Sequence, residues 1–355
     1  MKGNIIVGQS GGPTAAINSS LAGVYRTAID RGAKKVYGMR HGIQGLLNED
    51  YIDLSEHIQT DLDVELLKRT PAAYLGSCRY KLPEIHEDIA TYDKIFSILD
   101  KLEIECFIYI GGNDSMDTIK KLSDYAILRG HPTKFLGVPK TIDNDLALTD
   151  HTPGYGSAAK YIGTSVKEII QDSQALIYDK GLVTIVEIMG RNAGWLVGAA
   201  ALSKGEDCDG PDLIYVPELP FDIDNFLVRI KELLAEKTFV VVAVSEGIRL
   251  ADGRYVCELT DGVDFVDAFG HKQLTGTANY LARRLAQEIG CKTRTIELSS
   301  MQRAASHLAS RIDILEAFQV GGAAVKAADE GDTGEMVIIK RLSDDPYQST
   351  TDLRN

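Results

Sequence analysis

Residues 106–115 read CFIYIGGNDS and join an apolar run to a glycine-rich polar turn. The run 106–110 is continuously apolar, which is typical of a strand buried on both faces of a parallel sheet. Beyond the turn, apolar residues recur at helical spacing, at Met116, Ile119, Leu122 and Ala126. The stretch therefore predicts a strand, a tight turn and a helix, the repeating unit of α/β proteins.

The same unit recurs along the whole chain. Residues 4–7 form a first apolar run, which leads through the turn 8–14 into a helix with an apolar face at Ile17, Leu21, Val24 and Ala28. We expect further strands at 36–39, 135–138, 182–186, 213–216 and 239–244, and helices at 157–177, 193–203, 222–236, 275–289 and 302–328. This alternation predicts an α/β fold with two doubly wound, three-layer lobes and largely parallel sheets.

The length of 355 residues also suits two lobes better than one core. Proline and glycine cluster near residues 149–156, and Asp-Gly pairs occur near 250–262, which marks two candidate boundaries. We expect a first lobe at 1–150, completed by a returning segment at 256–355, and a second lobe at 151–255.

The composition argues against several classes of partner. A net charge of −13 disfavours non-specific binding to nucleic acid or to an anionic membrane. The five cysteines form no C-x-x-C pair, and with the odd count this favours a reducing, cytoplasmic compartment. The sequence contains no uninterrupted run of 18 apolar residues, so we expect no membrane span. The first residues predict a strand rather than a signal peptide.

Three loops carry the candidate chemistry. The turn 8–14 has small residues before a helix N-terminus, which suits a phosphate cradle, although a strand–helix turn without a ligand has the same pattern. The turn 111–115 adds a carboxylate and a hydroxyl. The segment 139–145 carries Lys140, Asp143 and Asp145: one carboxylate suits a base for a hydroxyl nucleophile and the other a metal ligand, while an Asp-rich turn is the alternative.

Three motifs occur in a fixed order: Gly-Gly-x-x-Ser at 111–115, Pro-x-Thr-Ile-Asp-Asn-Asp at 139–145, and Met-Gly-Arg at 189–191. Together they closely resemble the phosphofructokinase family. Further similarity lies at residues 8–19, 75–79, 243–247, 270–274 and 302–303, so the resemblance covers nearly the whole chain. It implies a phosphofructokinase-like fold with the phosphoryl donor in the first lobe and a sugar phosphate between the lobes.

The resemblance also implies roles for residues. Asp143 would be the base that deprotonates the 1-hydroxyl of the sugar, within a catalytic set of Asp143, Lys140, Asp114, Thr141 and Arg191. The implied donor contacts are Gly11, Arg79, Gly112, Asp114 and Ser115. The implied sugar-phosphate contacts are Thr141, Ile142, Asp143, Met189, Gly190, Arg191, Glu246, Arg294, Ser300 and Arg303. The cofactor would be Mg²⁺, held at Asn113 and Asp145.

Two residues favour pyrophosphate over ATP as the donor. The resemblance places Asp114 and Lys140 where relatives that use ATP have glycine. A carboxylate about 4 Å from the α-phosphate of ATP would repel that phosphate, with an interaction energy of roughly 4 kcal/mol at an effective dielectric near 20. We therefore expect reversible transfer from pyrophosphate to the 1-hydroxyl of fructose 6-phosphate, giving fructose 1,6-bisphosphate and phosphate, with Lys140 stabilising the charge on the oxygens.

Some positions depart from the family pattern. Asn113 replaces an aspartate of many relatives, Ser300 replaces a histidine, and Leu182 replaces an arginine that commonly reaches the sugar phosphate from a neighbouring subunit. These changes leave two alternatives open: sedoheptulose 7-phosphate as the preferred acceptor, or a sugar-phosphate-binding homologue without catalysis. Related lipid and dinucleotide kinases lack the motif at 139–145. The family also implies a cytoplasmic homodimer or homotetramer in carbohydrate metabolism, and the chain ends earlier than we expect for this branch.

Overall fold

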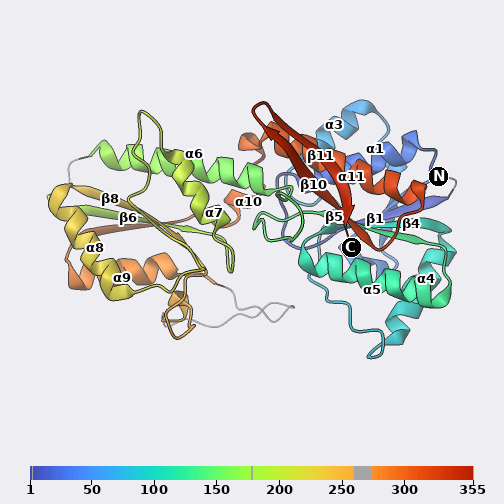
Figure 1. Ribbon diagram of the computed structural model, residues 1–355, viewed down its shortest axis with the longest axis horizontal. Helices are drawn as coiled ribbons and strands as arrows, with labels where there is room; N and C mark the ends of the chain where they lie inside the picture. Colours follow the sequence, from blue (N-terminus) through green and yellow to red (C-terminus); the bar gives the residue numbers. More distant parts are fainter. Residues whose placement is uncertain (2, 177–178, 260–273, 355) are drawn as a thin grey trace. The chain divides into compact units, whose positions relative to one another are not determined.

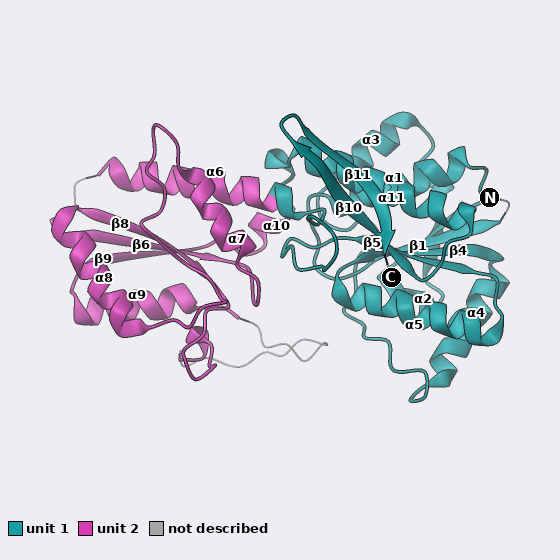
Figure 2. Cartoon of the chain, viewed as in Figure 1, with its two compact units in different colours: residues 1–157, 304–355 teal, residues 158–303 magenta. Residues whose placement is uncertain are grey.

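The computed structural model describes residues 1, 3–176, 179–259 and 274–354. Within these ranges the chain divides into two compact units (Figure 2). Unit 1 contains residues 1–157 and 304–355, and unit 2 contains residues 158–303. No helix in the described ranges is long and apolar enough to cross a membrane.

Unit 1 is built on a seven-stranded sheet with the order β11-β10-β5-β4-β1-β2-β3 (Figure 1). The central strands pair in parallel, whereas β3 and β11 pair antiparallel with their neighbours at the two edges. The bounds are β1 Asn4–Gln9, β2 Val36–Met39, β3 Tyr51–Asp53, β4 Ile104–Gly111, β5 Lys134–Pro139, β10 Glu335–Asp344 and β11 Tyr347–Arg354.

Helices cover both faces of this sheet because alternate strand residues point to opposite sides. Ile5 and Val7 of β1 share one apolar core with helices α1, α3 and α11, while Ile6 shares the other with α2, α4 and α5. These helices span α1 Ile17–Asp30, α2 Gly42–Leu47, α3 Asp61–Arg69, α4 Ile89–Lys101, α5 Asn113–Arg129 and α11 Arg311–Glu330, and two short 3₁₀ helices lie at Leu54–Glu56 and Ser306–Leu308. The result is a three-layer unit.

Unit 2 has a four-stranded parallel sheet with the order β7-β8-β6-β9. Its strands are β6 Leu182–Ile188, β7 Leu213–Tyr215, β8 Phe239–Ser245 and β9 Lys292–Glu297. Helices α8 and α9 pack on one face through an apolar core that includes Ile185, Val242, Phe226 and Leu281, and α6 covers the opposite face (Figure 1). The helices span α6 Tyr155–Gln174, α7 Trp195–Gly198, α8 Ile223–Glu236, α9 Thr277–Glu288 and α10 Met301–Ala304, with 3₁₀ helices at Ala199–Ser203 and Val256–Leu259.

The structure confirms the α/β class and the doubly wound, three-layer arrangement. The division between the lobes differs from the expected one, because β9 pairs in parallel with β6 and so keeps residues up to 303 in unit 2. The chain returns to unit 1 at Ala304, not near residue 256. The expected helix 302–328 is interrupted, and its long part begins at Arg311 after the cap Ser310. Residues 270–273 of the family-like segment lie outside the described ranges.

Candidate active site

Three neighbouring strands of unit 1, β5, β4 and β1, end at the same edge of the sheet. The loop after β1 contains Gly11 and Gly12, the loop after β4 contains Gly111 and Gly112, and Lys140 follows β5 directly. Ligands of open α/β sheets bind at this carboxyl edge. The three loops that the sequence singled out therefore lie together in space.

Lys140 links two of these loops. Its side chain is buried, with 3% of the residue exposed. The ammonium Nζ donates to the carbonyl of Gly12 at 2.8 Å, and the backbone N–H donates to the carbonyl of Gly111 at 2.9 Å. A Cβ at Gly11 would lie 3.1 Å from Nζ, in a backbone conformation with φ of +75° that favours glycine. The cation is thus fixed against the glycine loop after β1.

A further segment closes the loop after β1 from another side. The N–H of Gly11 donates to the carbonyl of Cys78 at 3.3 Å, and the hydroxyl of Ser77 donates to the carbonyl of Gly11 at 2.5 Å. Arg79 follows directly in the chain and is exposed. The structure therefore brings the segment carrying Arg79 next to Gly11, as a shared donor site requires.

The loop after β4 opens α5, whose N-cap is Gly112. A Cβ at Gly111 would lie 1.9 Å from the hydroxyl oxygen of Ser115, so only glycine allows this turn. Asp114 lies exposed in the first helical turn, where the helix dipole favours a negative charge. Asp114 therefore also stabilises the helix start, a role independent of any ligand.

The loop that carries Asp143 is held by hydrogen bonds within unit 1. The Asp143 N–H donates to the Thr141 hydroxyl at 3.1 Å, and the Thr141 N–H donates to the Pro153 carbonyl at 3.2 Å. Asn144 adopts a φ of +54°, and its side-chain oxygen accepts the N–H of Thr152 at 2.9 Å. Asp143 and Thr141 stay partly exposed, whereas Ile142 between them is buried.

Asn113 and Asp145, the predicted metal ligands, are in contact: the amide Nδ2 of Asn113 donates to Oδ2 of Asp145 at 3.1 Å. Asp145 keeps a solvent-accessible edge, yet the protein around its carboxylate raises its pKa, and the charge of Asp114 raises it further. A divalent cation here would offset the cost of keeping the Asp145 carboxylate ionised, so this carboxylate fits Mg²⁺. The described residues contain no cluster of three or more His, Cys, Asp or Glu side chains that could hold a metal.

In unit 2 the motif at 189–191 follows β6. The Gly190 N–H donates to Oε1 of Glu246 at 3.5 Å, and the hydroxyl of Ser245 donates to the Gly190 carbonyl at 2.6 Å. The Met189 N–H donates to Oε1 of Gln302 at 3.1 Å. The loops after β6 and β8 and the helix α10 are therefore joined at one edge of the second sheet.

Two residues of this edge were not predicted as site residues. Gln302 is 1% exposed and fixes α10 to the β6 loop, and Ser245 fixes the β8 loop to it. Both belong to family-like segments, at 302–303 and 243–247, and that was the signal available in the sequence. Arg303 follows Gln302 in α10, and Ser300 lies two positions before Gln302.

Arg294 is placed differently from the other predicted sugar contacts. It pairs in register with Thr184, four positions before Ile188 at the end of β6. Its guanidinium forms an ion pair with Asp172 of α6 at 2.6 Å. The structure therefore does not bring Arg294 to Gly190, and its contact with the sugar phosphate remains a prediction.

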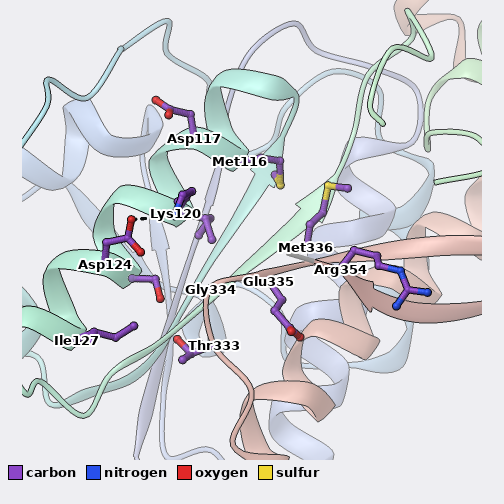
Figure 3. A pocket seen from close by; sticks show the side chains of 12 residues that line it. Met116, Asp117, Lys120, Asp124, Ile127, Thr333, Gly334, Glu335, Met336 and Arg354 are labelled. Carbon is purple, nitrogen blue, oxygen red and sulfur yellow. Dashed lines mark hydrogen bonds and ion pairs between the residues drawn. The ribbon is translucent and has the colours of Figure 1, made fainter. Parts of the chain in front are cut away.

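A surface pocket of about 440 Å³ lies beside α5 and the start of β10 (Figure 3). Met116, Ile119 and Met336 form its apolar wall, and Lys120 and Arg354 lie at its margin. None of the predicted site residues lines it. The candidate chemistry belongs to the loops at the strand ends and not to this pocket.

The geometry defines an α/β protein with glycine-rich loops at the carboxyl edge of a parallel sheet, the edge where ligands of such folds bind. A family model described as phosphofructokinase matches residues 4–328. The chain therefore belongs to the phosphofructokinase family, and the resemblance seen in the sequence is confirmed.

Individual relatives span almost the whole chain. The pyrophosphate–fructose 6-phosphate 1-phosphotransferase of Xanthomonas campestris pv. campestris is 43% identical over 346 residues, which are 98% of this chain and 81% of that protein. The protein of the same name from Halomonas elongata is 40% identical over 351 residues, 98% of this chain and 82% of that protein. The crystal structure of a pyrophosphate-dependent phosphofructokinase from Marinobacter aquaeolei superposes with a TM-score of 0.86 at 36% identity, covering 100% of this chain and 83% of that one.

Proposed function

We propose that this protein is a phosphotransferase that moves a phosphoryl group reversibly between pyrophosphate and the 1-hydroxyl of fructose 6-phosphate. The observation that carries the proposal is the buried ammonium of Lys140, which is held against Gly12 at the strand ends where Asp114 opens α5. The names of the relatives from Xanthomonas and Halomonas support the same donor and acceptor.

The charges at the loops after β1, β4 and β5 favour pyrophosphate over a nucleotide as the donor. The carboxylate of Asp114 repels an additional phosphate, and its side chain fills space that glycine would leave open. The cation of Lys140 attracts the oxygens of a compact diphosphate and stabilises the charge that develops during transfer. The backbone N–H groups at the start of α5, with Gly11, Ser115 and Arg79, complete the proposed donor contacts.

In the proposed mechanism, Asp143 accepts the proton of the sugar 1-hydroxyl. The oxygen then attacks the nearer phosphorus atom, the bond from that phosphorus to the bridging oxygen breaks, and phosphate leaves. Thr141 holds the loop through its hydrogen bond with the Asp143 N–H, and Lys140 stabilises the transferring and bridging oxygens. The reaction exchanges the anhydride bond of pyrophosphate for a phosphate ester and does not consume ATP. We therefore expect it to run in both directions.

Mg²⁺ is the proposed cofactor, held by Asp145 with Asn113 beside it. Bound Mg²⁺ would neutralise charge on the pyrophosphate oxygens. Asn113 offers a neutral amide oxygen only if the amide turns from its present orientation, in which its NH₂ group faces Asp145 at 3.1 Å. Asp145, water and pyrophosphate would then supply most of the oxygen ligands, as is usual for this ion.

Unit 2 supplies the proposed sugar-phosphate contacts at Met189, Gly190, Arg191, Glu246, Ser300 and Arg303. The names of the relatives favour fructose 6-phosphate over sedoheptulose 7-phosphate. The presence of Asp143 and Arg191 favours an active enzyme over a binding homologue. A glycolytic role in the cytoplasm and a homodimer or homotetramer complete the proposal.

The test is a matrix of donors and acceptors with Mg²⁺ in both directions. Pyrophosphate and ATP are each paired with fructose 6-phosphate and with sedoheptulose 7-phosphate. We expect the highest kcat/KM for pyrophosphate with fructose 6-phosphate. Higher turnover with ATP would overturn the donor, a preference for the seven-carbon sugar would overturn the acceptor, and binding without turnover would favour the homologue that lacks catalysis.

A further inference from the structure

The loop that carries Asp143 rests on the segment 149–154, which no proposed substrate contact uses. Thr152 donates from its N–H to Asn144 and from its hydroxyl to the Thr141 carbonyl, at 2.9 and 2.7 Å. Thr141 also forms a parallel β-bridge with Gly154. The position of Asp143 is therefore set by residues nine and eleven positions further along the chain.

His151, directly before Thr152, joins this segment to the C-terminal part of unit 1. Its Nδ1 lies 2.7 Å from Oδ1 of Asp150, and its Nε2 lies 2.7 Å from Oε2 of Glu316 on α11. The other carboxylate oxygen of Glu316 accepts the hydroxyls of Tyr347 and Ser349 from β11, each at 2.6 Å. The imidazole thus connects the loop support to α11, and through Glu316 to the last hairpin, beside the separate contacts that Thr149 and Asp150 make with β10.

Helix α11 is a rigid support for this contact. It crosses α1 so closely that a Cβ at Gly321 would lie 2.1 Å from the Ser20 carbonyl oxygen, and a Cβ at Gly23 would lie 2.0 Å from that of Phe318. Asp313, one turn before Glu316, accepts the N–H groups of Gly154 and Ser157 at 2.8 and 3.0 Å. Motion of the 149–154 segment is therefore limited by a helix that is itself closely packed.

We propose that His151 is a positioning residue for the phosphoryl-transfer loop, because its bridge between Asp150 and Glu316 ties the support of Thr141–Asn144 to α11. The inference rests on the proposed function, in which Asp143 must meet a hydroxyl at hydrogen-bond distance. The imidazolium donates from both nitrogens and satisfies both carboxylates, whereas neutral imidazole donates from one. The bridge is complete only in the protonated form.

The surrounding charges favour that form. Burial lowers the pKa of His151, but the hydrogen bonds and negative charges of Glu316 and Asp150 outweigh it and raise the pKa above its ordinary value. Arg341 of β10 faces Asp150 with ion-pair contacts as short as 2.9 Å, Tyr347 of β11 donates to Glu316, and Asp313 of α11 interacts electrostatically with His151. Both hydrogen bonds of the bridge therefore form below the raised pKa, and one of them is lost as the pH rises through it.

The experiment compares the full-length enzyme with His151→Gln, Glu316→Gln and the control His131→Gln. His131 also lies beside a carboxylate, at 2.9 Å from Asp100, but follows α5 at the far end of the sheet. We expect His151→Gln to lower kcat about tenfold, with both KM values within about twofold, since a small displacement of the base costs turnover and not ground-state binding. We expect the kcat of the wild-type enzyme to fall as the pH rises through the raised pKa of His151, and this fall should be absent in His151→Gln.

Hydrogen exchange provides a measurement independent of activity. The amides of Thr141, Asp143 and Thr152 should exchange about tenfold faster in His151→Gln and Glu316→Gln, and unchanged in His131→Gln. Unchanged exchange at these amides, or an unchanged pH profile of kcat, would overturn the positioning role. Wild-type enzyme without turnover on pyrophosphate and fructose 6-phosphate would overturn the proposed function instead, and the exchange comparison would still decide whether His151 holds the loop.

Discussion

In both sheets, the loops at the carboxyl ends of the strands carry the candidate ligand contacts. The ionisable groups buried near these ends have opposite charge in the two units. In unit 1 the ammonium of Lys140 lies among the loops themselves and interacts electrostatically with Asp145. In unit 2 the carboxyl of Glu187, 5% exposed on the penultimate residue of β6, faces inward and accepts the N–H of Ala278 at the start of α9, at 2.8 Å. One buried charge lies at the loops that we propose for the donor, and the other is part of the core.

The difference distinguishes a buried charge proposed for catalysis, Lys140, from a buried carboxyl that affects stability, Glu187. A buried charge is costly unless the protein or a ligand compensates for it. Glu187 reduces that cost by titrating: burial, with a smaller contribution from Glu297, raises its pKa to about 7. Lys140 is placed where the oxygens of a diphosphate would compensate its charge. Substitutions in unit 1 should therefore change turnover, whereas Glu187 should change stability.

The largest effect is expected at Asp143. Replacing it with alanine removes the proposed base, and general-base catalysis typically contributes about 10²–10⁴-fold. We expect kcat to fall by about a thousandfold or more while pyrophosphate still binds. Steady-state kinetics with pyrophosphate titration by calorimetry measures both. Near-normal turnover would show that another group takes the proton, and Asp117→Ala, an exposed acidic residue further along α5, is the matched control.

The next effect concerns the donor. Lys140→Gly removes the cation, and loss of one such electrostatic contact costs about 10²–10³-fold in kcat with pyrophosphate. Combining it with Asp114→Gly also removes the repulsion, so the ratio of kcat/KM for ATP to that for pyrophosphate should rise by at least about a hundredfold. Parallel assays with both donors measure the ratio. A double variant whose preference for pyrophosphate is unchanged would contradict the donor assignment.

The third prediction tests Glu187 through the pH dependence of stability. Its pKa of about 7 in the folded protein, against 4.5 ordinarily, means that the folded state binds more protons between these values. The free energy of unfolding should therefore fall as the pH rises from about 4.5 to about 7, by about 3 kcal/mol. Glu187→Gln keeps an acceptor for Ala278 and should remove this slope.

Denaturant unfolding of wild type and Glu187→Gln at pH 5 and pH 8 measures the difference. Glu288→Gln, an exposed carboxylate at the end of α9, is the control and should retain the wild-type slope. Equal slopes in wild type and Glu187→Gln would show that this carboxyl is ionised in the folded protein at neutral pH.

Local sequence patterns predicted the parts of the fold that depend on neighbouring residues. The apolar runs marked β1, β2 and β4 to β8 but not β3, β9, β10 or β11, and the glycine turns at 8–14 and 111–115 marked the loops, because steric and helix-cap requirements act within a few positions. β11 is mostly polar, and the apolar run 336–339 of β10 was not assigned to a strand from the sequence. β9 and β10 pair with β6 and β5, which lie more than 100 positions away, so the lobe boundary and the C-terminal support of the Asp143 loop required the structure.

The same reasoning explains which candidate site residues the sequence could single out. Lys140, Asp143 and Asp114 stand in ordered motifs, so the sequence could single them out. His151 and Gln302 act through distant partners, Glu316 and Met189, and only the folded chain brings these pairs together. The contact of His151 depends on three-dimensional packing and leaves no spacing to recognise, whereas Gln302 at least stands in the family-like segment 302–303.

The smallest effect is expected in unit 2, at Gln302. Gln302→Leu keeps the volume but removes the acceptor for the Met189 N–H and the donor to the Ser299 carbonyl. Losing a buried hydrogen-bond partner costs about 1–2 kcal/mol, so the KM for fructose 6-phosphate should rise about tenfold while the KM for pyrophosphate stays within about twofold. Initial rates with each substrate varied in turn measure both constants, and Gln319→Leu on the exposed side of α11 is the matched control. An equal rise in both KM values would mean that Gln302 supports the whole enzyme and not the sugar loop of unit 2 alone.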